Sequence, residues 1–153
     1  MVDFLPFRFF VDLRRYMYRL AGVRIGPTAC LYGRQVINFP QRLVIADQCF
    51  INGYCLFENA AEVSIGARTY VGPRVNFFTT NHDDVTMTNV VAEIRIGADC
   101  WIGGNATLLP GCILESGTTV AACAVMLRGF HRAGFYAGVP GKLKRPSPHD
   151  RAE

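Results

Sequence analysis

The chain has 153 residues, of which half are apolar and 18% are charged, and its formal net charge is +4. This length is typical of one domain with a substantial core, and so small a charge does not favour a nucleic-acid-binding protein. Only two lysines occur, Lys142 and Lys144, and both lie beside Arg145 in the run GKLKR. This cluster indicates a local anion-binding site, with a solubilising basic tail as the alternative.

The first 22 residues predict an amphipathic helix that ends at Gly22. Its predicted apolar face holds Phe9, Phe10, Leu13, Tyr16, Met17 and Leu20, and its polar face holds Arg8, Asp12, Arg15 and Arg19. These charges argue against a signal peptide or a membrane span, so we expect a cytoplasmic protein. We expect the helix to cap an open end of the fold, with contact to an anionic membrane surface as the alternative.

A period of six residues replaces the helical pattern after Gly22 and continues to residue 131. All fifteen residues that lead a six-residue repeat are apolar: Ile25, Leu31, Ile37, Ile45, Ile51, Phe57, Ile65, Val71, Phe77, Ile96, Ile102, Leu108, Leu114, Val120 and Met126. Two extra residues, or the insertion 83–95, separate groups of three repeats. The unit is therefore a turn of about 18 residues, present five times, whose three short strands stack into a triangular parallel β-helix.

The fifth place of most repeats holds a small residue, which predicts an inward position near a corner of the prism. These residues are Ala29, Cys49, Cys55, Ala61, Thr69, Cys100, Ala106, Cys112, Thr118 and Ala124, whereas Gln35, Gln41 and Phe130 depart from the rule. We therefore interpret the cysteines as reduced core residues. The predicted organisation is a capping helix (1–22), a β-helix (23–131) with an inserted loop (83–95), and a C-terminal extension (132–153).

Four stretches of this chain resemble the hexapeptide-repeat acetyltransferases of the maltose, galactoside and nodulation-factor group, and in particular the small relatives of exopolysaccharide and lipopolysaccharide synthesis. They are FINGYC (50–55), VSIGARTYVGPRVNFFTTNHD (63–83), IGADCWIGGNATLLPGCILESGTTVAACAV (96–125) and AGVPGKLKR (137–145). The resemblance implies an all-β fold, a left-handed parallel β-helix of about five turns. It also implies a homotrimer that binds acetyl-CoA between adjacent prisms, and no metal.

The resemblance also assigns roles to individual residues. It implies that His82 is the general base, that Asn52 contacts the acceptor, and that Trp101 packs beside the active site. It implies that the backbone N–H groups of Gly104 and Ala122 bind carbonyl oxygens of the donor. Basic residues near the phosphates of coenzyme A correspond to Lys142 and Arg145.

The leading hypothesis is transfer of an acyl group to a hydroxyl of a sugar or glycan precursor. A neutral alcohol is a poor nucleophile at pH 7, so a base such as the imidazole of His82 is needed. N-acetylation of an amino sugar, and a scaffold without catalytic activity, remain as alternatives. A metal site is disfavoured, because His82, His131 and His149 are not expected to converge.

The predicted fold also separates two of these residues. Asn52 is expected near the corner between the second and third faces of its turn, and His82 past the corner that closes the third face one turn later. About 15 Å of strand lies between them. We therefore expect each site to combine His82 of one subunit with Asn52 of its neighbour.

Overall fold

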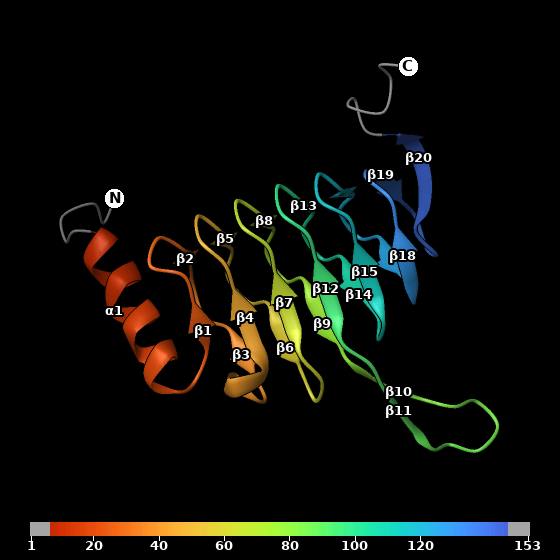
Figure 1. Cartoon of the computed structure of the whole chain (residues 1–153), viewed down its shortest axis with the longest axis horizontal. Coiled ribbons are helices and arrows are strands. Elements are labelled where there is room, and N and C mark those ends of the chain that lie inside the picture. The colour runs from red at the N-terminus through yellow and green to blue at the C-terminus, as the bar shows by residue number, and fades with distance from the viewer. Residues whose placement is uncertain (1–6, 147–153) are drawn as a thin grey trace.

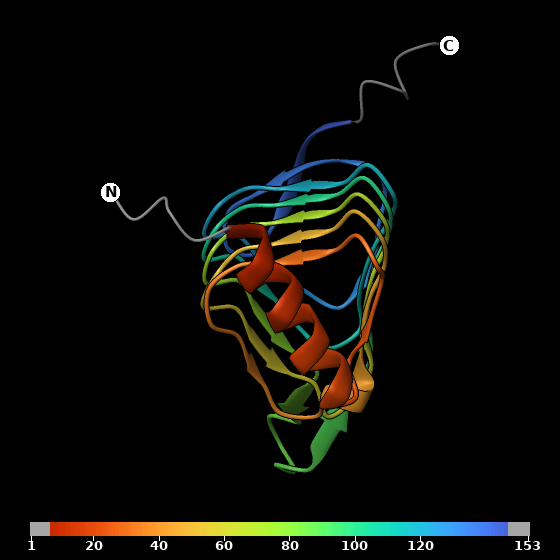
Figure 2. The ribbon, with the colours of Figure 1, turned by 90° about the vertical axis from the view of Figure 1, so that its left-hand side faces the viewer.

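The computed structural model describes residues 7–146, which form one helix followed by a triangular stack of short parallel strands (Figure 1). The helix, α1 (Phe7–Leu20), lies across one end of the stack, as the end-on view shows (Figure 2). A two-stranded antiparallel hairpin, β10 (Thr80–His82) and β11 (Asn89–Val91), projects from the side.

Three sheets form the faces of the prism. The first face contains β1 (Arg24–Ile25), β4 (Leu43–Ile45), β7 (Val63–Ile65), β12 (Ile94–Ile96), β15 (Cys112–Leu114) and β18 (Gly129–His131). The second contains β2 (Cys30–Leu31), β5 (Phe50–Ile51), β8 (Tyr70–Val71), β13 (Trp101–Ile102), β16 (Thr119–Val120), β19 (Gly134–Ala137) and the antiparallel β20 (Lys142–Pro146). The third contains β3 (Val36–Ile37), β6 (Leu56–Glu58), β9 (Asn76–Phe78), β14 (Thr107–Leu108) and β17 (Val125–Met126), and a 3-10 turn, Pro40–Arg42, follows β3.

The predicted lead positions form the core of this prism. Fourteen of the fifteen are buried, and Ile37, in the first turn, is partly buried against the same cluster. Because side chains alternate between the two sides of a strand, a register error of one residue would have exposed all of them. The predicted six-residue frame is therefore confirmed.

Two predicted boundaries need correction. The parallel ladder continues beyond residue 131, because β19 pairs with β16, so five complete turns are followed by an incomplete sixth. The inserted segment is the hairpin from Thr80 to Val91 rather than a loop over 83–95, because Ile94 is already buried in the first face. The two extra residues between turns lengthen the strands of this face, where Leu43 and Val63 align with Ile94.

The small residues at the fifth place lie at the corners as expected, and all but the half-buried Ala61 are buried. Gln35, which departs from the rule, is also buried. Its amide donates to the carbonyl oxygens of Tyr32 and Asn52, 2.7 and 2.9 Å away, and accepts from the N–H of Cys55 at 3.1 Å. A polar side chain is stable at this corner because its hydrogen-bonding groups are satisfied.

The helix faces the prism with its arginines, with the buried Val11 and with Tyr18, while most of the predicted apolar face is exposed. Hydrogen bonds run from each turn to both neighbouring turns: Gly26 N–H donates to Ile45 O of the next turn, and Arg68 N–H donates to Asp47 O of the preceding one. The first turn has no preceding turn, so its carbonyls that point outward lack a strand partner. Arginine side chains take its place: Arg14 donates to Leu31 O, Arg15 to Ala29 O and Arg19 to Ile25 O, at 3.0–3.3 Å.

The predicted helix end at Gly22 is confirmed. Gly22 has a φ of +104°, a conformation that favours glycine, and its N–H donates to Arg19 O. Among residues 7–146, no helix combines the length and the apolar content that crossing a bilayer requires.

All six cysteines are free, and Cys49, Cys55, Cys100 and Cys112 are buried. Burial raises the pKa of Cys55 to about 11 and that of Cys112 to about 12. These thiols therefore stay protonated, and hence unreactive, at neutral pH.

We expect Cys112→Leu to lower the free energy of unfolding by about 1–3 kcal/mol, because the larger side chain overpacks a corner. Cys123→Leu is the matched control, since Cys123 is exposed, and we expect a change below about 0.5 kcal/mol. Chemical denaturation measures both. Equal destabilisation by the two variants would contradict the inward position of Cys112.

Candidate functional site

A column of large side chains runs along the outside of the second face. Hydrogen-bonded register places Phe50, Tyr70, Trp101, Thr119 and Phe135 side by side on successive strands. The rings of Phe50 and Tyr70 stack with their centroids 4.7 Å apart, and 58% of Trp101 is exposed to solvent. The column is an apolar wall that the described chain leaves open.

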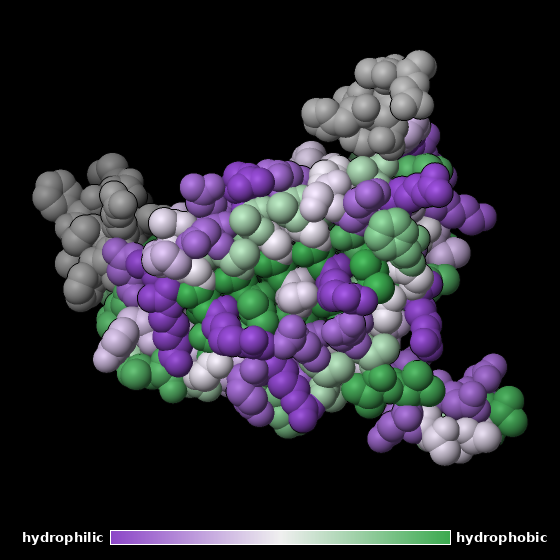
Figure 3. All heavy atoms as spheres, viewed as in Figure 1, coloured by the Kyte–Doolittle hydropathy of each residue, from purple (hydrophilic) through white to green (hydrophobic). Residues whose placement is uncertain are grey.

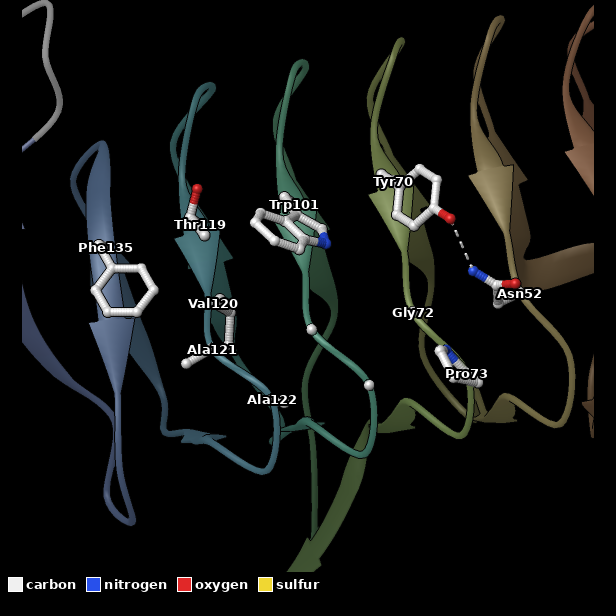
Figure 4. Close-up of a pocket in the computed structure, with 12 residues that line it drawn as sticks. Asn52, Tyr70, Gly72, Pro73, Trp101, Thr119, Val120, Ala121, Ala122 and Phe135 are labelled. Carbon is white, nitrogen blue, oxygen red and sulfur yellow. Dashed lines mark hydrogen bonds between the residues drawn. The ribbon is translucent and has the colours of Figure 1, made fainter.

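A groove of about 460 Å³ follows this column (Figure 4). It crosses five strands, from β5 to β19, which at about 4.8 Å per strand is roughly 19 Å. Its lining residues are Asn52, Tyr70, Gly72, Pro73, Trp101, Gly103, Gly104, Thr119, Val120, Ala121, Ala122 and Phe135. Three of the predicted donor residues, Trp101, Gly104 and Ala122, therefore lie in one groove with the predicted acceptor residue Asn52.

The corner beside the column exposes backbone hydrogen-bond donors to the groove. A Cβ atom at Gly103 would lie 2.3 Å from the backbone nitrogen of Ala122, so only glycine lets the successive turns stack here. Gly103 thus serves the geometry of the repeat. The N–H groups of Gly104 and Ala122 have no hydrogen-bond partner among residues 7–146. They can bind oxygen atoms of a ligand in the groove.

Asn52 lies at the other end of the groove and is held in place by its neighbours. Its Nδ2 donates to the hydroxyl of Tyr70 at 3.3 Å (Figure 4). The same nitrogen donates to the carbonyl oxygen of Val71, also at 3.3 Å. Within the described chain, its Oδ1 has no donor. Asn52 can therefore accept a hydrogen bond from a ligand hydroxyl.

Arg145 and Lys142 lie on β20, which pairs with β19 at the far end of the groove. The guanidinium of Arg145 sits over the ring of Phe135, 5.0 Å from its centroid, and Phe135 lines the groove. Lys142 pairs with Ala137 and is exposed, outside the set of residues that line the groove. The structure thus places a cation at the groove through Arg145.

His82 lies apart from these residues, at the end of β10 where the hairpin leaves the prism. It is exposed, and its Nδ1 is 3.4 Å from the carbonyl oxygen of Met87. Protonation of Nδ1 would make this contact a weak hydrogen bond and leave Nε2 as the basic nitrogen. The hairpin turn is fixed by the Asp83 carboxylate, whose pKa is lowered because the N–H and hydroxyl of Thr86 and the N–H of Val85 donate to it.

His82 lines a different cavity, of about 260 Å³, together with Asn81, Val90, Leu109, Pro110, Leu127 and Arg128. The sequence analysis had not singled out Arg128, whose charge has no ion-pair partner among residues 7–146. Tyr70 and Phe135 were also missed. Both share the sheet register of Trp101 and Thr119, so reading the outward place of each turn could have found them.

His131 does not line the cavity that contains His82. The ring of His131 lies with its Nε2 2.9 Å from the carbonyl oxygen of Leu127 and packs edge-on against Tyr136, and His149 lies outside the described residues. Within residues 7–146, no three His, Cys, Asp or Glu side chains are grouped closely enough to hold a metal ion.

Glu58 supports the strand that carries His82. Its carboxylate accepts hydrogen bonds from the N–H groups of Thr79 and Thr80, at 3.1 and 3.2 Å, and from the Thr80 hydroxyl at 3.1 Å. The chain leaves the third face at these two threonines. Glu58 therefore fixes the direction in which β10 and His82 project.

A stack of parallel three-stranded turns with a groove beside one corner defines a triangular parallel β-helix. A family model described as bacterial transferase hexapeptide (six repeats) matches residues 93–128. The chain is 29% identical, over 140 residues, to the putative lipopolysaccharide biosynthesis O-acetyl transferase WbbJ of Escherichia coli. The match covers 82% of this chain and 68% of that relative, and for seven further relatives it covers only 47–62% of their length.

Two solved structures have the same fold. A maltose O-acetyltransferase from Clostridium difficile superposes with a TM-score of 0.82 at 18% identity, covering 95% of this chain and 79% of that one. A hexapeptide-repeat acetyltransferase from Vibrio cholerae, solved with acetyl coenzyme A, gives 0.80 at 24% identity, covering 88% and 76%. The predicted left-handed parallel β-helix and the predicted resemblance to hexapeptide-repeat acetyltransferases are both confirmed.

We expect Glu58→Ala to lower the free energy of unfolding by about 1–3 kcal/mol, because three hydrogen bonds to a half-buried carboxylate are lost. Glu62→Ala is the matched control: Glu62 follows the same strand but makes only an exposed ion pair with Arg24, worth about 1 kcal/mol or less. Hydrogen exchange of the amides from Thr79 to Thr88 should speed up only in the Glu58 variant. Unchanged exchange there would show that Glu58 does not support the hairpin.

Proposed function

We propose that this protein transfers the acetyl group of acetyl-CoA to a hydroxyl of a sugar or glycan precursor. The observation that carries the proposal is the groove of the second face, in which two unpaired backbone N–H groups lie beside a column of aromatic side chains. The related acetyltransferases favour the same chemistry, since one is named for lipopolysaccharide biosynthesis and another was solved with acetyl-CoA.

The groove suits an extended donor. It is long, narrow and mostly apolar, and the N–H groups of Gly104 and Ala122 provide donors for carbonyl oxygens along such a chain. Arg145 supplies a positive charge where phosphates would lie at the end of the groove, with Lys142 as a second cation on the same strand. Acetyl-CoA supplies an acyl group on a good leaving thiolate. The protein's part is to hold it and to activate the acceptor.

His82 acts as the general base in this proposal. Nε2 takes the proton of the acceptor hydroxyl as that oxygen attacks the acyl carbon, and it returns the proton to the departing sulfur. Met87 O holds the ring orientation through Nδ1. Oδ1 of Asn52 accepts a hydrogen bond from the acceptor and positions it beside the donor.

The separation of the two cavities supports a site shared between subunits. His82 and Asn52 line different cavities on different sides of one prism. A homotrimer would bring the hairpin of one copy against the groove of the next and form three identical sites. The free cysteines suit a reducing compartment, so we propose a cytoplasmic enzyme.

Release of free thiol from acetyl-CoA in the presence of a panel of sugars tests the activity. We expect release with at least one acceptor and an ester in the product by mass spectrometry, whereas an amide would indicate N-acetylation. His82→Ala should lower kcat by about 10²–10⁴-fold. Because His82 is exposed, the thermal unfolding midpoint should not change. His131→Ala is the control, and turnover of the His82 variant at the wild-type rate would remove His82 from the mechanism.

Mixing two inactive variants tests the shared site. We refold His82→Ala and Asn52→Ala chains together in equal amounts. Random assembly should restore about a quarter of the sites, because an intact site needs His82 from one chain and Asn52 from its neighbour. Each variant refolded alone is the control. Mixed trimers that stay as inactive as the separate variants would contradict a site built from two subunits.

A further inference from the structure

An exposed apolar patch covers the outer side of α1. Leu13, Tyr16, Met17 and Leu20 lie one helical turn apart on one face, and 44–66% of each is exposed. Figure 2 looks directly at this helix, and Figure 3 shows hydrophobic atoms at the same edge of the molecule. The orientation is enforced from the other side, because the arginines of α1 bind the carbonyls of the first turn.

The same end of the prism is strongly basic. Residues 7–42, which comprise α1 and the first turn, contain seven arginines and a single acidic residue, Asp12. The rest of the chain contains nine basic and eleven acidic residues. Arg34, in the first turn, is exposed and has no ion-pair partner within residues 7–146. The positive charge of the protein is thus concentrated around the apolar patch.

An apolar helix face surrounded by arginines complements an anionic lipid surface. Helices of this kind lie in the plane of the headgroups, where burial of the apolar side chains adds to attraction between arginines and lipid phosphates. A second copy of the chain fits less well. The four side chains offer a few hundred Å², short of the roughly 800 Å² per partner in a stable interface, and two such ends would bring like charges together.

We propose that α1 docks the protein on a bilayer rich in anionic phospholipid. Leu13, Tyr16, Met17 and Leu20 enter the interfacial region. The positive charge at this end of the prism, including the unpaired Arg34, attracts the anionic headgroups while the arginines of α1 keep their bonds to the first turn. The axis of the prism then stands away from the membrane, and the groove and His82 on its sides remain open to solvent. This docking is independent of the proposed catalysis.

Co-sedimentation with vesicles tests the proposal. The full chain is mixed with vesicles of phosphatidylcholine alone or of phosphatidylcholine and phosphatidylglycerol at 3:1. We expect binding to the anionic vesicles and at least ~10-fold weaker partitioning to the neutral ones. Met17→Glu with Leu20→Glu should lower partitioning to the anionic vesicles by a further ~10-fold or more. Both the burial of apolar side chains and the attraction to anionic headgroups are weakened in this variant.

Val139→Glu with Leu143→Glu is the matched control, because both residues are comparably exposed, at 72% and 48%, and lie at the opposite end of the prism. This control adds the same charge as the helix variant, and we expect it to retain binding to the anionic vesicles. Circular dichroism and thiol release with a soluble acceptor should be unchanged in the helix variant. If the glutamates unfold α1, the milder Met17→Ser with Leu20→Ser gives the same comparison.

Several results would overturn the proposal. These are no binding of the wild-type chain to anionic vesicles, and equal loss of binding in the helix and control variants. A mass by light scattering that falls in the helix variant would identify a second copy as the occupant. Vesicle binding that appears only after deletion of residues 1–6 would show that this segment occupies the patch.

Discussion

The hydrogen bonds between stacked turns determine much of this structure. Each turn bonds to the turns on both sides of it, so the first turn, which has no preceding turn, is left with outward-pointing carbonyls that no strand can reach. Unpaired carbonyl groups at a sheet edge are costly when buried and invite association when exposed. Side chains that cap them must be donors. Arginines on α1 donate these hydrogen bonds, and the apolar face of the same helix is consequently exposed to solvent.

The same ladder produces the groove. Because successive turns are in register, each outward position becomes a column, and the corner beside this column leaves the N–H groups of Gly104 and Ala122 without a partner among residues 7–146. A column of rings beside these two N–H groups is an apolar wall with polar contacts one turn apart. Gly103 shows how tightly the spacing is set, since a single methyl group there would collide with the next turn. The groove therefore follows from the repeat and needs no additional loop.

The sequence alone predicts the repeat well because the repeat is local and strict. Lead residues and small corner residues recur at fixed intervals, so burial of Phe57 or Cys112 could be read directly from position. The orientation of α1 could not be read from the sequence in this way. Amphipathicity predicts that the apolar face is buried. Here the carbonyls of Ile25, Ala29 and Leu31 determine the orientation instead, and they lack strand partners because no turn precedes the first.

Catalysis in the proposed mechanism depends on the β10–β11 hairpin, the element that does not follow the six-residue repeat. Identical stacked turns present similar surfaces along their length, which suits the binding of an extended donor but does not single out one reacting atom. The hairpin interrupts this regularity once, and the carboxylates of Glu58 and Asp83 hold it by accepting hydrogen bonds from backbone N–H groups. Its direction carries His82 away from the groove of its own chain. A base on such a projection can reach a donor held by the regular face of a second prism, so one interruption per chain is enough to define one reaction centre per pair of neighbours.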